Sequence, residues 1–179
     1  MRTPWGESQE SKKYARGIVF YYTASHGGFH LSHGMNAHVP SFMRNEDGWY
    51  EEDCEAVKVI ISFDYLFGDA AFLEALATLK DYYPNAYESL TGKTLRPEES
   101  YVRREEEAKK NLANSWVVSS AWGSWNPKVP KGFVGVYATK GIERTGEAKY
   151  FLIPEEEYKI RGEHFVVDTS RHQEVEQIG

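Results

Sequence analysis

The residues best suited to chemistry lie in one short stretch, Thr23 to His33, which reads TASHGGFHLSH. Four of the chain's six histidines fall between positions 26 and 38. Hydroxyl side chains and two consecutive glycines lie among them. The stretch therefore offers nucleophiles, general bases and adaptable backbone side by side, and we take it as the candidate site.

The glycine pair predicts a β-hairpin. Residues 18–23 are apolar, β-branched and aromatic and predict a central strand, and residues 29–33 form the return strand. Gly27-Gly28 suits a two-residue turn, which would place Ser25 opposite His30. One face would then carry four polar side chains: Thr23, Ser25, His30 and Ser32. A shift of register by one residue would abolish this arrangement.

Ligand recognition is the first interpretation of this hairpin. Exposed amides of a glycine pair form an anion-binding concavity, and a neighbouring aromatic ring stacks on a base. This favours a small nucleotide-like or phosphorylated ligand. The predicted contact residues are Thr23, Ser25, His26, Gly27, Gly28, His30, Ser32, Trp49 and Tyr50. The competing interpretation is that the glycines serve the turn geometry alone.

Nucleophilic catalysis is the second interpretation, and it would make the protein a small hydrolase or a nucleotide-processing enzyme. Ser25 would be the nucleophile, His26 or His30 the base, and Asp53 the group that orients the imidazole. The sequence lacks the G-x-S-x-G elbow of many hydrolases. Cys54 is spaced like a helix-core residue and is the weaker nucleophile. Whether the protein is an enzyme stays open, with the balance against it.

A metal site is the third interpretation. The candidate ligands are His26, His30 and His33, with Glu52 or Asp53 completing the coordination. Their spacing fits no established zinc pattern, and histidines on a hairpin are commonly plain surface residues. We therefore expect neither a metal nor another cofactor.

The remaining elements place helices in the middle of the chain and strands at both ends. Helices are predicted over 50–63 and 69–82 from apolar spacings of three and four. A short helix over 85–90 ends at Gly92, and a charged helix over 97–113 begins at Pro97-Glu98-Glu99. Later strands are predicted over 115–122, 133–138, 148–153 and 164–168, with a helix start at 154–158. This order predicts an α+β fold, with an antiparallel sheet from the N- and C-terminal strands and the central helical segment packed on it.

The length of 179 residues fits one domain. We expect a single domain over 1–179 with these parts: lead-in 1–16, hairpin 17–33, helical middle 50–114, C-terminal strands 115–168 and tail 169–179. The lead-in is polar, and Trp5 is expected to dock on the body. The tail is expected to fray.

Composition narrows the class of protein. The net charge of −6 argues against general nucleic-acid binding, which needs a basic face. The single cysteine excludes a disulfide within the chain. No apolar run approaches the roughly 20 residues that cross a bilayer, and the N-terminus lacks a signal-peptide pattern. We therefore expect a cytoplasmic protein without membrane contact.

Three motifs together resemble a known family: Thr3-Pro4-Trp5-Gly6, Ser25-His26-Gly27-Gly28-Phe29 and Trp49-Tyr50-Glu51-Glu52-Asp53. The segment from Phe151 to Asp168 adds to the likeness, which runs over nearly the whole chain. The family consists of uncharacterised proteins common in bacteriophages and bacterial mobile elements, described only as a domain of unknown function. The resemblance implies a small accessory phage protein acting in the host cytoplasm, a class that often counters host defences.

The expected function is therefore binding: the protein would sequester a small ligand or block a host protein. The loop 122–127 holds two tryptophans, of which an exposed one would anchor a protein partner. The alternatives are the small enzyme described above and a structural or assembly role. A homo-oligomer is left open.

Overall fold

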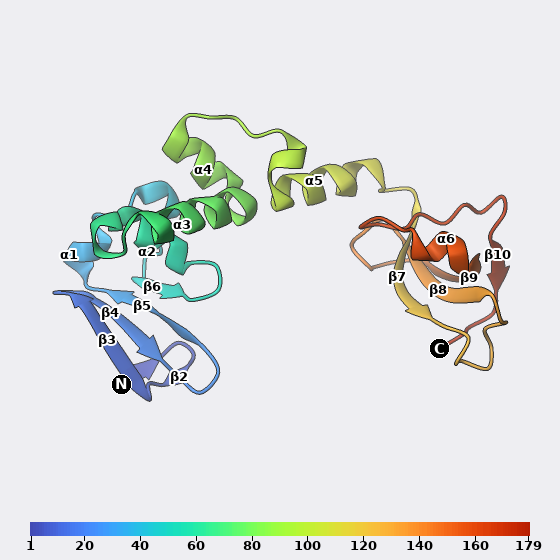
Figure 1. Ribbon diagram of the computed structural model, residues 1–179, viewed down its shortest axis with the longest axis horizontal. Coiled ribbons are helices and arrows are strands. Elements are labelled where there is room, and N and C mark those ends of the chain that lie inside the picture. Colours follow the sequence, from blue (N-terminus) through green and yellow to red (C-terminus); the bar gives the residue numbers. More distant parts are fainter. The chain divides into compact units, whose positions relative to one another are not determined.

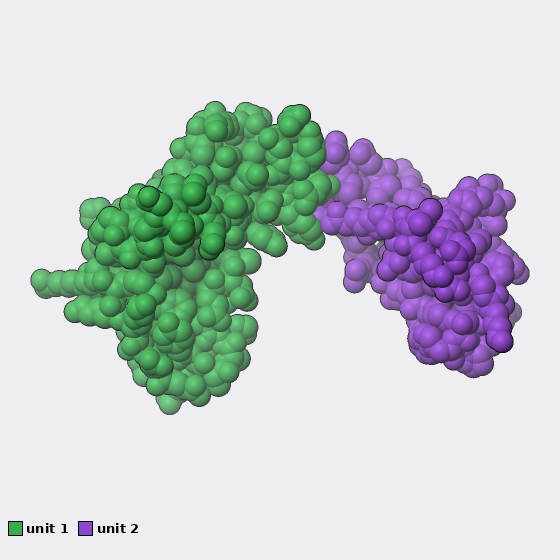
Figure 2. Space-filling view, viewed as in Figure 1, with its two compact units in different colours: residues 1–104 green, residues 105–179 purple.

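The computed structural model describes all residues, 1–179, and divides into two compact units, residues 1–104 and 105–179 (Figures 1 and 2). The α+β class is confirmed, because antiparallel strands lie towards both ends of the chain and helices lie in the middle. The strands form three sheets, and the N- and C-terminal strands belong to different ones. No helix has the length and apolar character needed to cross a membrane.

The main sheet of the N-terminal unit has four antiparallel strands in the order β3-β4-β5-β6. Their bounds are β3 Glu10–Ala15, β4 Ile18–Tyr22, β5 Gly27–Leu31 and β6 Trp49–Glu51. Side chains alternate between the two faces of a strand, so one face carries the core residues Phe20, Phe29 and Tyr50. In Figure 1, α2 and α3 lie over one face of this sheet.

The polar lead-in expected over 1–16 contains three strands. β1 (Arg2–Thr3) and β2 (Gly6–Glu7) form a small hairpin, and β3 pairs with β4 along its whole length. β3 is an edge strand whose first four residues are exposed, so it carries polar side chains and lacks the apolar alternation of an inner strand.

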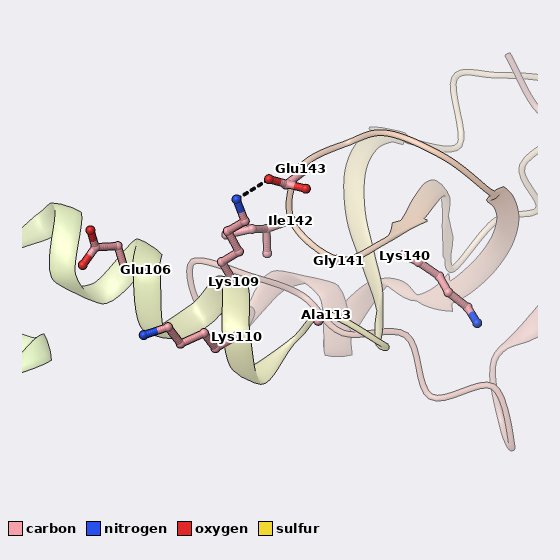
Figure 3. A pocket seen from close by; sticks show the side chains of 8 residues that line it. All are labelled: Glu106, Lys109, Lys110, Ala113, Lys140, Gly141, Ile142 and Glu143. Atoms are coloured by element: carbon pink, nitrogen blue, oxygen red, sulfur yellow. Dashed lines mark ion pairs between the residues drawn. The ribbon is translucent and has the colours of Figure 1, made fainter.

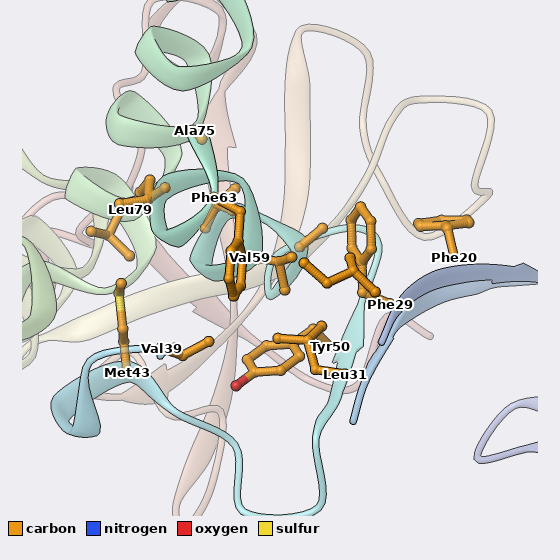
Figure 4. Packing of buried hydrophobic residues seen from close by; sticks show 14 of the residues in the cluster. Phe20, Phe29, Leu31, Val39, Met43, Tyr50, Val59, Phe63, Ala75 and Leu79 are labelled. Atoms are coloured by element: carbon orange, nitrogen blue, oxygen red, sulfur yellow. The ribbon is translucent and has the colours of Figure 1, made fainter. Parts of the chain in front are cut away.

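The helices of this unit cover the inner face of the sheet. They are α1 His33–Asn36, α2 Ala56–Ser62, α3 Asp69–Tyr82 and α4 Pro84–Thr91, with 3-10 turns η1 Ser41–Met43, η2 Asp64–Leu66 and η3 Pro97–Glu99. Figure 4 shows the shared core, in which Tyr50 and Leu31 of the sheet face Val59 and Leu79 of the helices. These four side chains are at most 2 % exposed, so one apolar core holds sheet and helices together.

The predicted helix over 69–82 is confirmed with the same bounds, and the short helix over 85–90 is confirmed as α4, which ends at the left-handed Gly92. The helix predicted over 50–63 is wrong in its first part, since residues 49–51 are strand β6 and α2 begins at Ala56. The reason is tertiary: Tyr50 pairs with Phe29 and buries its ring, which outweighs the local helix signal of the acidic run.

The C-terminal unit is built on a second antiparallel sheet, in the order β10-β9-β8-β7. The elements of this part of the chain are α5 Tyr101–Asn111, β7 Trp116–Trp122, β8 Phe133–Lys140, β9 Ala148–Pro154, α6 Glu155–Lys159 and β10 Gln173–Val175. Its core is separate from that of the first unit and includes Val136, Phe151 and Ile153.

Two predictions for the end of the chain are wrong. Residues 164–168 do not form a strand, and only an isolated bridge joins Val166 to Val117. The tail is not frayed, because Gln173–Val175 forms the edge strand β10 and Ile178 is 3 % exposed. Ile178 packs with Val129 and Leu152, and this apolar contact holds the otherwise polar tail in place.

Candidate functional site

A small hairpin places Trp5 on the outer face of the N-terminal sheet. The hydroxyl of buried Thr3 donates to the Gly6 carbonyl at 2.9 Å and accepts from the Trp5 amide at 3.2 Å. Gly6 takes the positive φ of 124° that this turn requires. The Trp5 ring then lies against Gly28 of β5. The expected docking of Trp5 on the body is confirmed.

The predicted two-residue turn at Gly27-Gly28 is wrong. Strands β4 and β5 pair with Tyr22 opposite Gly27, so the turn consists of residues 23–26. Thr23 closes this turn, because its amide and its hydroxyl both donate to the His26 carbonyl, at 2.8 and 2.7 Å. The predicted cross-strand pair of Ser25 and His30 is therefore absent.

The two glycines allow close packing inside a strand. A Cβ on Gly27 would lie 2.6 Å from the Glu52 Oε2, and a Cβ on Gly28 would lie 2.6 Å from the Tyr50 carbonyl oxygen and would collide with the Trp5 ring. Both glycines lie in β5, between β4 and β6, and neither has a positive φ. The exposed anion-binding turn that we predicted is consequently not formed.

The outer face of the sheet carries a cluster of aromatic side chains. The ring centre of Trp49 lies 4.4 Å from that of His30 and 5.7 Å from those of both Trp5 and Tyr21. All four residues are partly exposed. The pairing register puts Lys13 of β3 on the same face. We call Trp5, Tyr21, His30 and Trp49 the aromatic platform.

His30 is the titratable member of the platform. Burial lowers the pKa of its imidazole below the ordinary value, and the nearby Asp47 carboxylate opposes this only in part. At neutral pH the neutral form of the ring therefore predominates, with one nitrogen able to donate and the other able to accept a hydrogen bond.

A second group of polar side chains lies where β5 and β6 meet the turn. His26, Glu51 and Glu52 each place one atom that could bind a metal, an imidazole nitrogen or a carboxylate oxygen, within 4.8 Å of the other two. The His26 Nδ1 is 3.8 Å from the Glu51 Oε1, which is too long for a hydrogen bond. A backbone hydrogen bond holds Glu52 close to the turn that carries His26, because the Glu52 amide donates to the Gly27 carbonyl at 3.0 Å.

The other predicted site residues are dispersed. Tyr50 lies in the core and its hydroxyl donates to the Asn36 Oδ1 at 2.6 Å. Ser32 caps α1 by accepting from the Met35 amide at 3.5 Å, and His33 is the exposed first residue of that helix. Ser25 and Asp53 are exposed, and neither side chain hydrogen-bonds a histidine. Burial raises the pKa of the Cys54 thiol, which disfavours the thiolate.

The C-terminal unit has two features of its own. A hollow of about 590 Å³ lies between the end of α5 and the loop after β8. Its lining includes Lys109, which pairs with Glu143 (Figure 3). The amino groups of Lys110 and Lys140 point away from each other, so these lysines do not converge on one anion. In the tryptophan loop, Trp122 packs near Tyr150 at 6.2 Å between ring centres, whereas Trp125 is 76 % exposed.

Sequence reasoning missed Tyr21 and Glu51 as site residues and gave Trp5 only a structural role. Tyr21 of β4 pairs with Ser11 of β3, and both residues face outward. Strand alternation predicts this orientation once the register of the strands is known. Glu51 was assigned to a helix and only its strand conformation brings it towards His26.

Trp5, Gly28 and Trp49, one residue from each of the three motifs quoted above, lie on the outer face of the N-terminal sheet, whereas Phe29 and Tyr50 lie in its core. Residues 1–113 match a family described as a domain of unknown function, DUF7007. The chain belongs to this family. The DUF7007 match contains the whole N-terminal unit and α5, and residues 114–179 lie beyond it. Neither the curated proteins nor the solved structures contain a match to the chain.

Proposed function

We propose that the protein acts by binding, and that the aromatic platform is its recognition surface for a nucleotide-like ligand. The observation that carries this proposal is the placement of Trp49 against three partly exposed rings on the outer face of the sheet. Tryptophans with exposed edges on a sheet face provide large, rigid contact area at low entropic cost.

The platform has the chemistry that a nucleotide needs. A base stacked on an aromatic side chain gains roughly 1–3 kcal/mol, largely independent of its identity. Neutral His30 supplies one hydrogen-bond donor or acceptor beside the stack. Lys13, exposed on the same face, is placed to attract a phosphate.

The family resemblance supplies the biological setting of the proposal. As an accessory protein of phage type in the host cytoplasm, the protein would counter a defence by sequestering a nucleotide-like signal. Blocking a host protein through the same platform is the second form of the proposal, because exposed tryptophan and tyrosine also anchor protein interfaces.

The enzyme alternative has less support. It required Ser25 beside a histidine, but the Ser25 hydroxyl hydrogen-bonds neither His26 nor His30, and Asp53 uses its amide to hold the Glu51 carboxylate. No hydrogen bond therefore links a nucleophile, its base and an orienting acid here.

The test is to incubate the purified full chain with cell extract, wash it, denature it and identify the released small molecules by mass spectrometry. Wild type should release a nucleotide-like compound unchanged, Trp49→Leu should release at least about tenfold less, and Trp125→Leu should match wild type. Trp125 is the control because it is an exposed tryptophan of the other unit.

Three results would contradict the proposal. Equal release from Trp49→Leu and wild type would place the ligand elsewhere, and a chemically altered product would favour the enzyme. The third result has two parts: no small molecule is released, and tryptophan fluorescence does not change when nucleoside monophosphates are added. This result would contradict the ligand-binding form of the proposal. Circular dichroism of Trp49→Leu checks that the variant is folded.

A further inference from the structure

One oxygen of the Glu51 carboxylate makes no hydrogen bond. Its Oε2 accepts from the Asp53 amide at 2.8 Å, whereas its Oε1 is sealed from solvent and is the only such side-chain atom in the chain without a hydrogen bond. An unsatisfied buried carboxylate oxygen is costly, and a bound cation would satisfy it. The group on its open side is the imidazole of His26, at 3.8 Å.

From this we infer that His26, Glu51 and Glu52 bind a first-row divalent cation, Zn²⁺ or Mn²⁺. Imidazole nitrogen and carboxylate oxygen are ligands of both metals. Ligand bonds of roughly 2.0–2.2 Å place two ligands of one metal about 3–4 Å apart, which agrees with the separation of the His26 and Glu51 donor atoms. The site does not depend on the platform's ligand.

Charge and backbone also favour a cation here. The Glu51 and Glu52 carboxylates bring two negative charges together, with their oxygens and the His26 imidazole nitrogen all within 4.8 Å of one another. A divalent cation would neutralise this repulsion. Thr23 holds the turn that carries His26, and the Glu52 amide donates to the Gly27 carbonyl, so backbone hydrogen bonds position the main chain of both ligands.

The protein would fill only part of the cation's coordination shell. Three protein ligands leave at least one position for water or an oxygen of a bound molecule. Both His26 and Glu52 are exposed, so the open positions face solvent. Because Glu51 pairs with Gly28, on which Trp5 rests, the cation would lie on the same sheet as the platform.

The experiment is calorimetric titration of the full chain with ZnCl₂, with MnCl₂ and with MgCl₂ for comparison. Wild type should bind one Zn²⁺ or Mn²⁺ per chain. His26→Ala and Glu51→Gln should each weaken binding at least about tenfold, since even changes to groups around metal ligands cost about 10- to 100-fold. The control variants are Asp53→Asn and His38→Ala, which change an exposed acid and an exposed histidine outside the three ligands. Their metal affinity should stay within about twofold of that of wild type.

Thermal unfolding separates a metal site from a structural role. Added metal should raise the melting temperature of wild type and Asp53→Asn, and should leave that of Glu51→Gln unchanged. The inference is overturned if binding to wild type does not saturate at one cation, or if Asp53→Asn weakens binding as much as Glu51→Gln does. The latter result would indicate diffuse attraction by the acidic segment. Neither result bears on nucleotide release by the platform.

Discussion

The Tyr50 hydroxyl is held on two sides within the N-terminal core. It donates to the Asn36 Oδ1 at 2.6 Å and accepts from the Asn45 amide at 3.1 Å. Tyr50→Phe removes both bonds and leaves two polar groups unpaired, so we expect a loss of about 1–3 kcal/mol in the free energy of unfolding. Urea denaturation measures it, with Tyr65→Phe, 73 % exposed, as the control. Equal stability of Tyr50→Phe and wild type would mean that water replaces the hydroxyl.

His30 gives the N-terminal unit a pH dependence. Burial lowers the pKa of the folded imidazole below 6.5, so between that lowered pKa and 6.5 the unfolded chain binds more protons than the folded chain. The free energy of unfolding should therefore fall as pH drops through this window and be insensitive to His30 above it. An NMR titration of the imidazole, assigned with His30→Gln, measures the pKa. A value at or above 6.5 would contradict the prediction.

At the scale of elements, Gly28 joins the β1–β2 hairpin to the sheet. A methyl group at this position would collide with the Trp5 ring and with the Tyr50 carbonyl, which is backbone and cannot move aside. Gly28→Ala should therefore displace Trp5, lower stability by about 1–3 kcal/mol and change the near-ultraviolet dichroism of the tryptophans. Gly34→Ala is the control, because a Cβ there meets nothing within 4 Å. Similar spectra for Gly28→Ala and wild type would show that Trp5 is not seated as described.

The elements also show what the sequence could and could not predict. The helix over 69–82 was predictable, because local apolar spacing and Pro84 after its end define it. The β4–β5 register was not, because Gly27-Gly28 matches a turn as well as a strand, and the close contacts of Gly28 with Trp5 and of Gly27 with Glu52 come from distant parts of the chain. The candidate site therefore differs from the predicted one. Of the predicted contact residues, His26, His30 and Trp49 are at least partly exposed, whereas Tyr50 lies in the core.

At the scale of the whole molecule, the two units have separate apolar cores. The buried residues of the first core lie between Ile18 and Ala86, and those of the other two clusters lie between Val129 and Ile178. The DUF7007 match ends at residue 113, just beyond α5. The family domain therefore contains a complete core, the aromatic platform and the three proposed metal ligands.

We expect the fragment 1–113 to fold without the rest of the chain, because its core needs no residue from 114–179. It should show a cooperative thermal transition, and Leu79→Ala should lower the free energy of unfolding by about 2–5 kcal/mol in the fragment and the full chain alike. Ile153→Ala, buried in the second core, is the matched change and should leave that transition of the full chain in place. An unfolded fragment, with one shared transition in the full chain, would instead support a single domain over 1–179. Differential scanning calorimetry of the fragment and of the full chain distinguishes these results, because it shows whether the cooperative unfolding transition extends past residue 113.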